Sequence, residues 1–82
     1  MEKIFVVEMT YFDETNGEVS VSTSVHRTEQ GAVNYLKGEV EYTLEHFKDM
    51  DAEVHQESEL SAMVTWNQGY YEVNVEEKII NE

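Results

Sequence analysis

The sequence predicts an α+β domain in which one helix packs on a largely antiparallel four-stranded sheet, in the order ββαββ. Thr28–Lys48 has the three- and four-residue apolar spacing of an amphipathic helix. The segments before and after it alternate between apolar and polar residues, as half-buried strands do. An Asn-Gly turn divides the first of these segments into two strands, and an Asn-Gln-Gly turn divides the second. Because the chain has 82 residues and no repeat or linker, we expect residues 1–82 to form a single domain.

A hairpin is predicted at the start of the chain. Its first strand is Lys3–Phe12, with an inner face formed by Phe5, Val7, Met9 and Tyr11. Asn16-Gly17 predicts the turn, since both residue types tolerate positive φ. The return strand is Glu18–His26. We expect its inner face to carry Val19, Val21, Thr23 and Val25, and its outer face to carry Ser20, Ser22, Ser24 and His26.

The helix is the most clearly defined element of the sequence. Thr28 is a suitable N-cap because its hydroxyl can accept a hydrogen bond from a free backbone N–H, and Glu29 suits the positive end of the helix dipole. Its apolar stripe is wide enough to cover one face of a sheet and comprises Ala32, Val33, Leu36, Val40, Leu44 and Phe47. We expect Gly38 to allow close packing on that sheet.

The second half of the chain is predicted to form two further strands. Ala52–Trp66 is expected to be one strand with a polar, edge-like beginning, and Leu60, Ala62, Val64 and Trp66 share one of its faces. A turn at Asn67-Gln68-Gly69 leads into Tyr70–Ile80, whose buried side is expected to carry Tyr71, Val73, Val75 and Ile79.

A single helix leaves the second face of the predicted sheet uncovered. That face combines charged residues with large apolar ones, namely Ile4, Val6, Phe12, Met63 and Tyr70. Apolar residues gathered on an open face are typical of an interaction surface. We therefore expect a homodimer or a bound partner, and the alternative is a plain exposed sheet.

The composition limits the functions that the chain can perform. Eighteen acids against five Lys and Arg give a formal net charge of −13, so phosphates of nucleic acid or of an anionic membrane would repel it. A basic partner is favoured, although acidity can also serve solubility alone. No signal peptide or membrane span is recognisable, which together with the absence of cysteine favours the cytoplasm.

Catalytic and metal-binding patterns are absent from the sequence. The three histidines lack the close spacing of a zinc site, and no serine lies in a nucleophile-elbow pattern. No glycine-rich loop is present that could hold a phosphate. We therefore expect a protein that is not an enzyme and that uses no metal or cofactor.

The acids themselves are the candidate binding residues. Glu41 and Glu45 are one helical turn apart, about 6 Å along the axis, and alternate strand residues repeat about every 6.6 Å. Successive phosphates of a nucleic-acid strand are separated by a similar distance, roughly 6–7 Å. Rows of carboxylates could therefore imitate a phosphate backbone, and the alternative is an ordinary solvated face. The candidate partner-binding residues are Glu39, Glu41, Glu45, Asp49, Asp51, Glu53, Glu57, Glu59, Glu72 and Glu76.

The passage Val25-His26-Arg27-Thr28-Glu29-Gln30-Gly31-Ala32-Val33 runs from a strand through a Thr-Glu cap into a helix. With the small size, the acidity and the order of elements, it resembles a class of small acidic phage early proteins that act in host takeover. That class includes DNA mimics that block basic host DNA-binding proteins, such as inhibitors of the nucleoid protein HU. The resemblance implies an inhibitor acting in the host cell cytoplasm, and it assigns no role to individual residues.

Two main functional hypotheses follow from the sequence, and a third alternative is a small enzyme with an unrecognised site, which would require a deep, polar-lined pocket. In the first, the protein is an acidic, non-enzymatic inhibitor or DNA mimic that binds a basic nucleic-acid-binding protein through rows of Asp and Glu. In the second, it is a small protein-interaction or assembly module that associates through the open sheet face, with acidity serving solubility.

Overall fold

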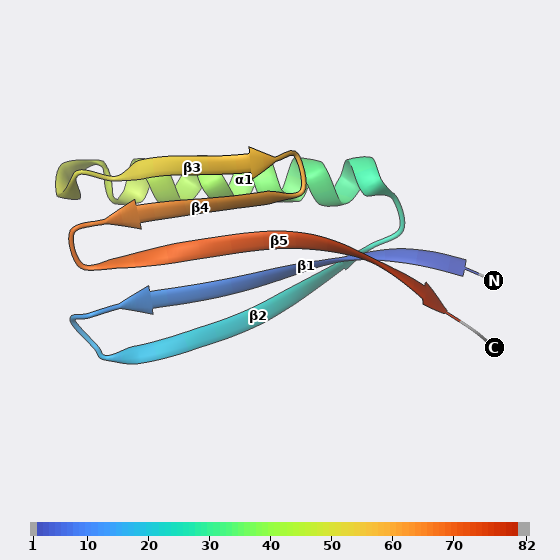
Figure 1. Cartoon of the computed structure of the whole chain (residues 1–82), viewed down its shortest axis with the longest axis horizontal. Coiled ribbons are helices and arrows are strands. Elements are labelled where there is room, and N and C mark those ends of the chain that lie inside the picture. The colour runs from blue at the N-terminus through green and yellow to red at the C-terminus, as the bar shows by residue number, and fades with distance from the viewer. Residues whose placement is uncertain (1, 81–82) are drawn as a thin grey trace.

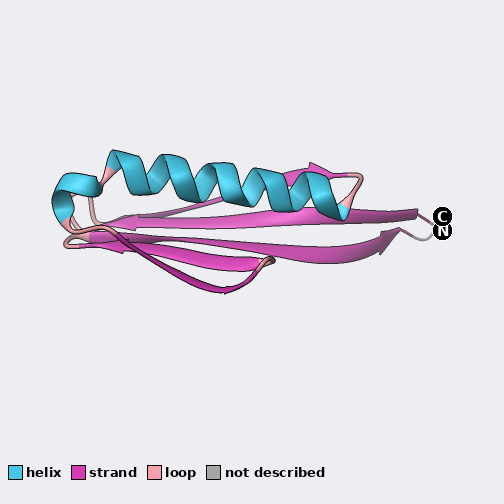
Figure 2. Cartoon of the chain, turned by 90° about the horizontal axis from the view of Figure 1, so that it is seen from above, coloured by secondary structure: helices cyan, strands magenta, loops and turns pink. Residues whose placement is uncertain are grey.

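The computed structural model describes residues 2–80 and shows one five-stranded antiparallel sheet with a single layer of helix on one face (Figures 1 and 2). The strands lie in the order β2-β1-β5-β4-β3. The elements are β1 (Glu2–Asp13), β2 (Glu18–His26), α1 (Glu29–His46), the short 3₁₀ helix η1 (Lys48–Met50), β3 (Glu53–Ser58), β4 (Ser61–Trp66) and β5 (Gly69–Ile80). Residues 1, 81 and 82, which the expected domain includes, lie outside the described residues.

The combination of α and β elements is as predicted, but the four-stranded ββαββ arrangement is wrong. Ala52–Trp66 forms two strands, β3 and β4, which fold back on each other at Glu59 and Leu60. In this hairpin Val54 lies opposite Val64, and the polar β3 becomes the edge of the sheet. The turn contains no Gly, Asn or Pro, so its sequence resembles a continuing strand. It is held by the Leu60 N–H donating to Ser58 Oγ (3.1 Å) and by the Val75 N–H donating to the Leu60 carbonyl (2.8 Å).

Helix α1 begins as the sequence predicts. Thr28 has extended backbone angles, and its Oγ1 accepts a hydrogen bond from the Gly31 N–H at 3.0 Å, which confirms the N-cap. The helix ends at His46, two residues before the predicted end at Lys48. The predicted stripe faces the sheet: Ala32, Val33, Leu36, Val40 and Phe47 are buried, and Leu44 is half-buried.

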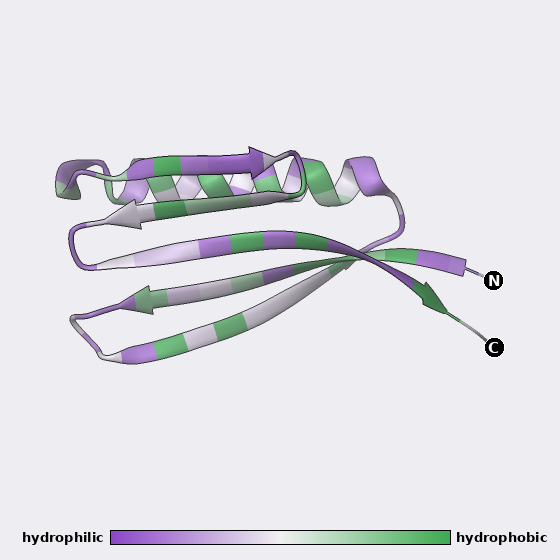
Figure 3. Ribbon diagram, viewed as in Figure 1, coloured by the Kyte–Doolittle hydropathy of each residue, from purple (hydrophilic) through white to green (hydrophobic). Residues whose placement is uncertain are grey.

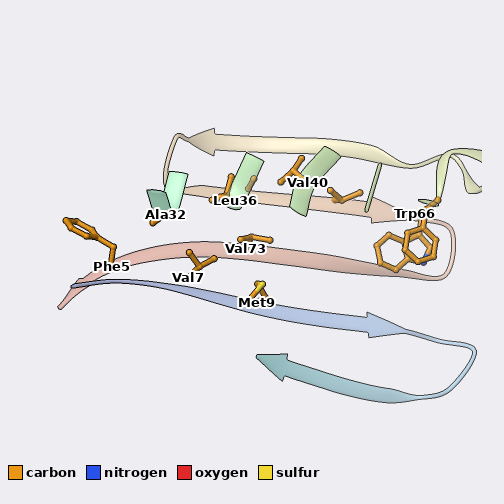
Figure 4. Close-up of a cluster of buried hydrophobic side chains, with 11 residues drawn as sticks. Phe5, Val7, Met9, Ala32, Leu36, Val40, Trp66 and Val73 are labelled. Carbon is orange, nitrogen blue, oxygen red and sulfur yellow. The ribbon is translucent and has the colours of Figure 1, made fainter. Parts of the chain in front are cut away.

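The core lies between α1 and the middle of the sheet (Figure 4). Val7, Leu36, Val64 and Val73 are among its fully buried members. At the far end of α1, the rings of Phe47 and Trp66 stack with centroids 3.8 Å apart. The helix therefore covers β1, β5 and β4, and it makes fewer contacts with the edge strands β2 and β3.

The predicted faces of β2 are reversed in the structure. Val25 pairs with Val6, and Val6 is on the face opposite the buried Val7. Consequently Ser20, Ser22, Ser24 and His26 are on the helix side, whereas Val19, Val21, Thr23 and Val25 are on the open face. The reversal follows from the loop length, because the four residues Glu14–Gly17 connect the closing pair Asp13 and Glu18. Leu60 and Ile79, which were also predicted on buried faces, are exposed, because Leu60 lies in the β3–β4 turn and Ile79 near the end of β5 that extends past α1.

The buried carboxylate of Asp13 connects the β1–β2 turn to the end of β4. Asp13 accepts hydrogen bonds from the Thr15 N–H (2.8 Å) and from the Trp66 indole N–H (3.2 Å). These bonds, that of Thr15 first, lower the pKa of Asp13. Nearby, a Cβ on Gly69 would overlap the backbone carbonyl of Phe12, so only glycine allows β5 to approach β1 this closely.

Two glycine-to-alanine substitutions should have opposite effects on stability. A Cβ added at Gly38 meets nothing within 4 Å, so the expected packing role of Gly38 is wrong. Gly38→Ala should raise the free energy of unfolding by up to about 1 kcal/mol, because alanine is the better helix former. Gly69→Ala should lower it, since the new methyl group clashes with backbone. Chemical denaturation monitored by circular dichroism checks both, and stabilisation by Gly69→Ala would contradict the structure.

Candidate functional site

Three consecutive elements bring most of the candidate acids to one long side of the molecule. The second half of α1 is followed by η1 and then by β3, which returns beside the helix on the side of the sheet away from β2 (Figure 1). Apart from Glu39, the acids from the second half of α1 through η1 and β3 to the turn after β3 are exposed. We call them the acidic surface: Glu41, Glu45, Asp49, Asp51, Glu53, Glu57 and Glu59.

Local geometry explains how these acids are positioned. Glu41 and Glu45 are one turn apart and therefore lie on the same side of α1. Asp51 adopts the left-handed backbone conformation (φ 56°), which Asp tolerates better than most residues, and it redirects the chain from η1 into β3. Glu53 pairs with Thr65 and so lies on the open sheet face. The acidic surface thus extends around the β3 edge from the helix layer to the opposite face.

Little positive charge opposes the acidic surface. Lys48 lies within it, and its Nζ is 2.7 Å from Glu45 Oε1. His55 Nε2 lies 4.0 Å from Glu53 Oε2, a contact that is ionic only when the histidine is protonated. Two of the other basic residues are engaged elsewhere: Lys3 pairs with Glu77 and Lys78 pairs with Glu76. Lys37, one turn before Glu41, lies on the same side of α1, so two lysines stand against the seven acids of this surface.

The other candidate acids lie on another flank of α1 or on β5, where Glu72 lines a shallow hollow together with Glu57 of the acidic surface. Glu39 is half-buried on the flank of α1 that faces β5, where its Oε1 accepts a hydrogen bond from the Tyr71 hydroxyl at 3.2 Å. Glu72 and Glu76 are on the open sheet face, opposite Thr10 and Val6 of β1. Helical spacing separates Glu39 from Glu41, but only the packing of α1 on the sheet shows which of the two contacts β5.

Beside Glu39, an open cavity of about 260 Å³ lies between α1 and the sheet. Its wall is mainly aromatic, with the Glu39 carboxylate as the charged group. The lining residues are Tyr11, Glu39, Tyr42, Thr43, His46, Phe47 and Tyr71. The sequence analysis did not identify this cavity, although Tyr11 and Tyr71 were assigned to the same sheet face. An aromatic wall next to a carboxylate is suited to a cationic side chain.

The three aromatic residues interleaved with the candidate acids have different environments. Tyr42 is exposed at the rim of the cavity, and its ring stacks on that of His46. Trp66 is buried in the core. Tyr70 lies on the open face, with its ring centroid 5.8 Å from that of Phe12. Tyr42 is thus the aromatic residue that is exposed next to Glu41.

Residues 2–80 contain no group of three His, Cys, Asp or Glu side chains placed to hold a metal ion. No helix in the same range has the length and apolar character needed to cross a membrane. Comparison with family models, with curated protein sequences and with solved structures gave no match to this chain.

The contact between Glu39 and Tyr71 should be visible in a titration. Burial, and then the negative charge of Glu39, raise the pKa of Tyr71 above the ordinary value of about 10. Glu39→Gln should lower the pKa of Tyr71 without returning it to the ordinary value, because the burial remains. Absorbance titration of tyrosinate in the protein and in its Tyr71→Phe variant measures this, with Glu41→Gln as the control.

The same raised pKa links stability to pH. Above about pH 10 the unfolded chain loses the Tyr71 proton while the folded chain keeps it, so the free energy of unfolding should fall as pH rises. In the titration described above, a Tyr71 pKa that is unchanged by Glu39→Gln would contradict the hydrogen bond between Glu39 and Tyr71.

Proposed function

We propose that the protein is a non-enzymatic inhibitor that acts as a DNA mimic and binds a basic nucleic-acid-binding protein through the acidic surface. The observation that carries this proposal is the gathering of exposed acids from α1, η1 and β3 on one side, where the lysine among them is already paired with Glu45. The resemblance to phage early proteins supports a partner in the host cell cytoplasm, such as a nucleoid protein.

The shape of the molecule supports imitation of a nucleic acid. The protein is a short rod, with extents of 45 × 23 × 17 Å, and the acidic surface lies along its length. Carboxylates one helical turn apart, such as Glu41 and Glu45, are separated by about 6 Å along the axis, which is close to the spacing of phosphates along a strand. Basic side chains that bind a phosphate backbone would find a comparable row of negative charges here.

The electrostatics favour fast but salt-sensitive association. Exposed carboxylates of one sign attract a basic protein over about a Debye length, roughly 8 Å at physiological ionic strength. Added salt screens this attraction, so binding of the partner should weaken steeply as ionic strength rises.

The aromatic cavity beside Glu39 supports a second, specific contact on another flank of the same helix. It adjoins the second half of α1, where Tyr42 and Glu41 are neighbours in the chain and both are exposed. A lysine or arginine of the partner could insert its side chain between the rings and approach the Glu39 carboxylate. The acids would then attract the partner, and the cavity would fix its orientation.

Charge reversal in α1 and η1 should abolish most of this binding. Replacing Glu41, Glu45 and Asp49 by Lys should weaken affinity about tenfold or more, since each attraction to a basic partner becomes a repulsion. Replacing Glu2, Glu14 and Glu77 by Lys changes the net charge equally and is the matched control. Affinity is measured by calorimetry for a DNA-binding protein recovered from lysate at low salt.

Competition with DNA completes this test. Partners that are released by high salt and displaced by DNA fit the proposal, and recovery of only neutral or acidic proteins would refute it. Equal weakening by the two charge-reversal triples would show that net charge, and not the acidic surface, attracts the partner.

The open sheet face supports the second candidate function, that of an assembly module. It carries Ile4, Val6, Phe12, Met63 and Tyr70, as predicted, and it gains the valines of β2. Val19, Val21 and Val25 are 57%, 69% and 62% exposed. Acidity would then serve only to keep the apolar face from non-specific aggregation.

This second function predicts a different response to mutation. Val6→Glu should abolish association through the open face, because it places a carboxylate at the centre of the apolar contact. Association should depend weakly on salt, and sedimentation at several ionic strengths measures it. Association that survives Val6→Glu with unchanged circular dichroism would exclude the open face.

A further inference from the structure

Strand β2 is an edge strand whose outer edge pairs with no other strand among residues 2–80. It follows β1 at the end of the strand order, at the side of the sheet away from β3 and α1 (Figure 1). Its pairing with β1 runs without a bulge from Phe5 and His26 to Asp13 and Glu18. In an antiparallel sheet, alternate residues of an edge strand direct their N–H and C=O groups away from the neighbouring strand. The outer side of β2 therefore presents a straight row of unpaired backbone groups.

The side chains of β2 do not protect this edge. Natural edge strands are usually short, bulged, or marked by Lys, Pro or other charged residues. Residues 19–25 are Val, Ser and Thr only, in a chain with eighteen acids and five Lys and Arg. The other edge is different: β3 has six residues, an irregularity between Gln56 and Ser58, and two glutamates. Figure 3 shows the contrast, with β3 mostly purple and β2 alternating between green and pale segments.

The sequence of β2 is nearly the same when it is read in either direction from Ser22. An antiparallel copy centred on Ser22 would place Val19 opposite Val25, Ser20 opposite Ser24 and Val21 opposite Thr23. At the ends, Glu18 would lie opposite His26, which is a complementary pair. A two-fold interface requires this kind of self-complementarity, because each copy presents the same surface to the other.

We propose that two copies of this chain pair through β2, antiparallel and in register about a two-fold axis at Ser22, and so form one continuous sheet. Valine then faces valine or threonine on the open side, and serine faces serine on the helix side. Such β-branched and hydroxyl pairs across neighbouring strands are favourable. This proposal is independent of the proposed function, because it uses none of the residues of the acidic surface.

Two acidic chains can pair at the β2 edge because residues 19–25 are uncharged and the acidic surface lies at the other edge of the sheet. Four strand spacings of about 4.8 Å separate β2 from β3, which is roughly 19 Å. The two acidic surfaces therefore lie at opposite ends of the joined sheet, more than a Debye length apart. Salt should leave this pairing intact or strengthen it, whereas salt should weaken the binding of a basic partner.

Single cysteines test the register directly, since the described residues, like the whole sequence, contain no cysteine. Ser22→Cys places two thiols opposite each other at the axis. Facing Cα atoms are about 4.5–5.5 Å apart, within the range of a disulfide. We expect Ser22→Cys to form a covalent dimer under mild oxidation.

Ser20→Cys and Ser24→Cys are the matched controls. Each alone should stay largely unlinked, because its own copy lies four residues along the strand, about 13 Å away. A mixture of the two variants should crosslink, because residue 20 faces residue 24 of the other copy. Equal crosslinking by all three single variants, or none by Ser22→Cys, would overturn the proposal.

A charge at the axis provides a reversible test. Ser22→Glu and Ser22→Lys both place like charges opposite each other, so each should convert the dimer to a monomer in sedimentation equilibrium. Ser22→Lys makes the chain less acidic, so loss of the dimer in this variant cannot be attributed to net charge. Gln56→Lys on the other edge is the control and should leave the dimer intact.

Three results of this experiment would refute β2 pairing. These are a monomer at every protein concentration, a dimer that survives Ser22→Lys, and a dimer that is lost only in Val6→Glu. The last result would instead assign the contact to the open sheet face.

Discussion

The width of a single helix limits how much of this sheet can be covered. An α-helix with its side chains is about 10–12 Å across, whereas five strands at about 4.8 Å span roughly 19 Å. Helix α1 therefore packs its stripe over β1, β5 and β4, and neither edge strand contributes a residue to the buried core. The serines of β2 and the polar residues of β3 are consistent with this limit, because they lie where no second helix is present.

Features that depend on local spacing are predictable from the sequence, whereas features that depend on contacts between distant segments are not. The Thr28 cap and the stripe from Ala32 to Phe47 depend on local spacing, and the structure confirms both. The turn at Glu59 and Leu60 was missed because it has no residue type that favours turns, and its stability depends on a hydrogen bond from Val75 in another strand. Alternation predicts that β2 has two different faces, but the loop length determines which face meets the helix.

The candidate site shows a similar division. Acids close in sequence, from Glu41 to Glu59, form one surface because α1, η1 and β3 follow one another along the same side. Glu39, only two residues before Glu41, instead turns toward Tyr71. Helical periodicity places Glu39 and Glu41 on different sides of α1, but only the packed sheet shows that the Glu39 side forms an aromatic cavity.

The loops at one end of the rod are tied to one another. Asp13 bonds to Trp66, the Glu14 N–H donates to the Gln68 carbonyl at 2.7 Å, and the Asn67 N–H donates to the Met50 carbonyl at 3.1 Å. At the opposite end, Ile79 and Ile80 are exposed and β1 and β5 extend beyond the helix. Local opening should therefore begin at this end of β1 and β5, and amide exchange should slow toward the hydrogen-bonded loops. Acid should weaken the hydrogen-bonded end, since the contribution of Asp13 to stability is lost as the pH falls through its lowered pKa.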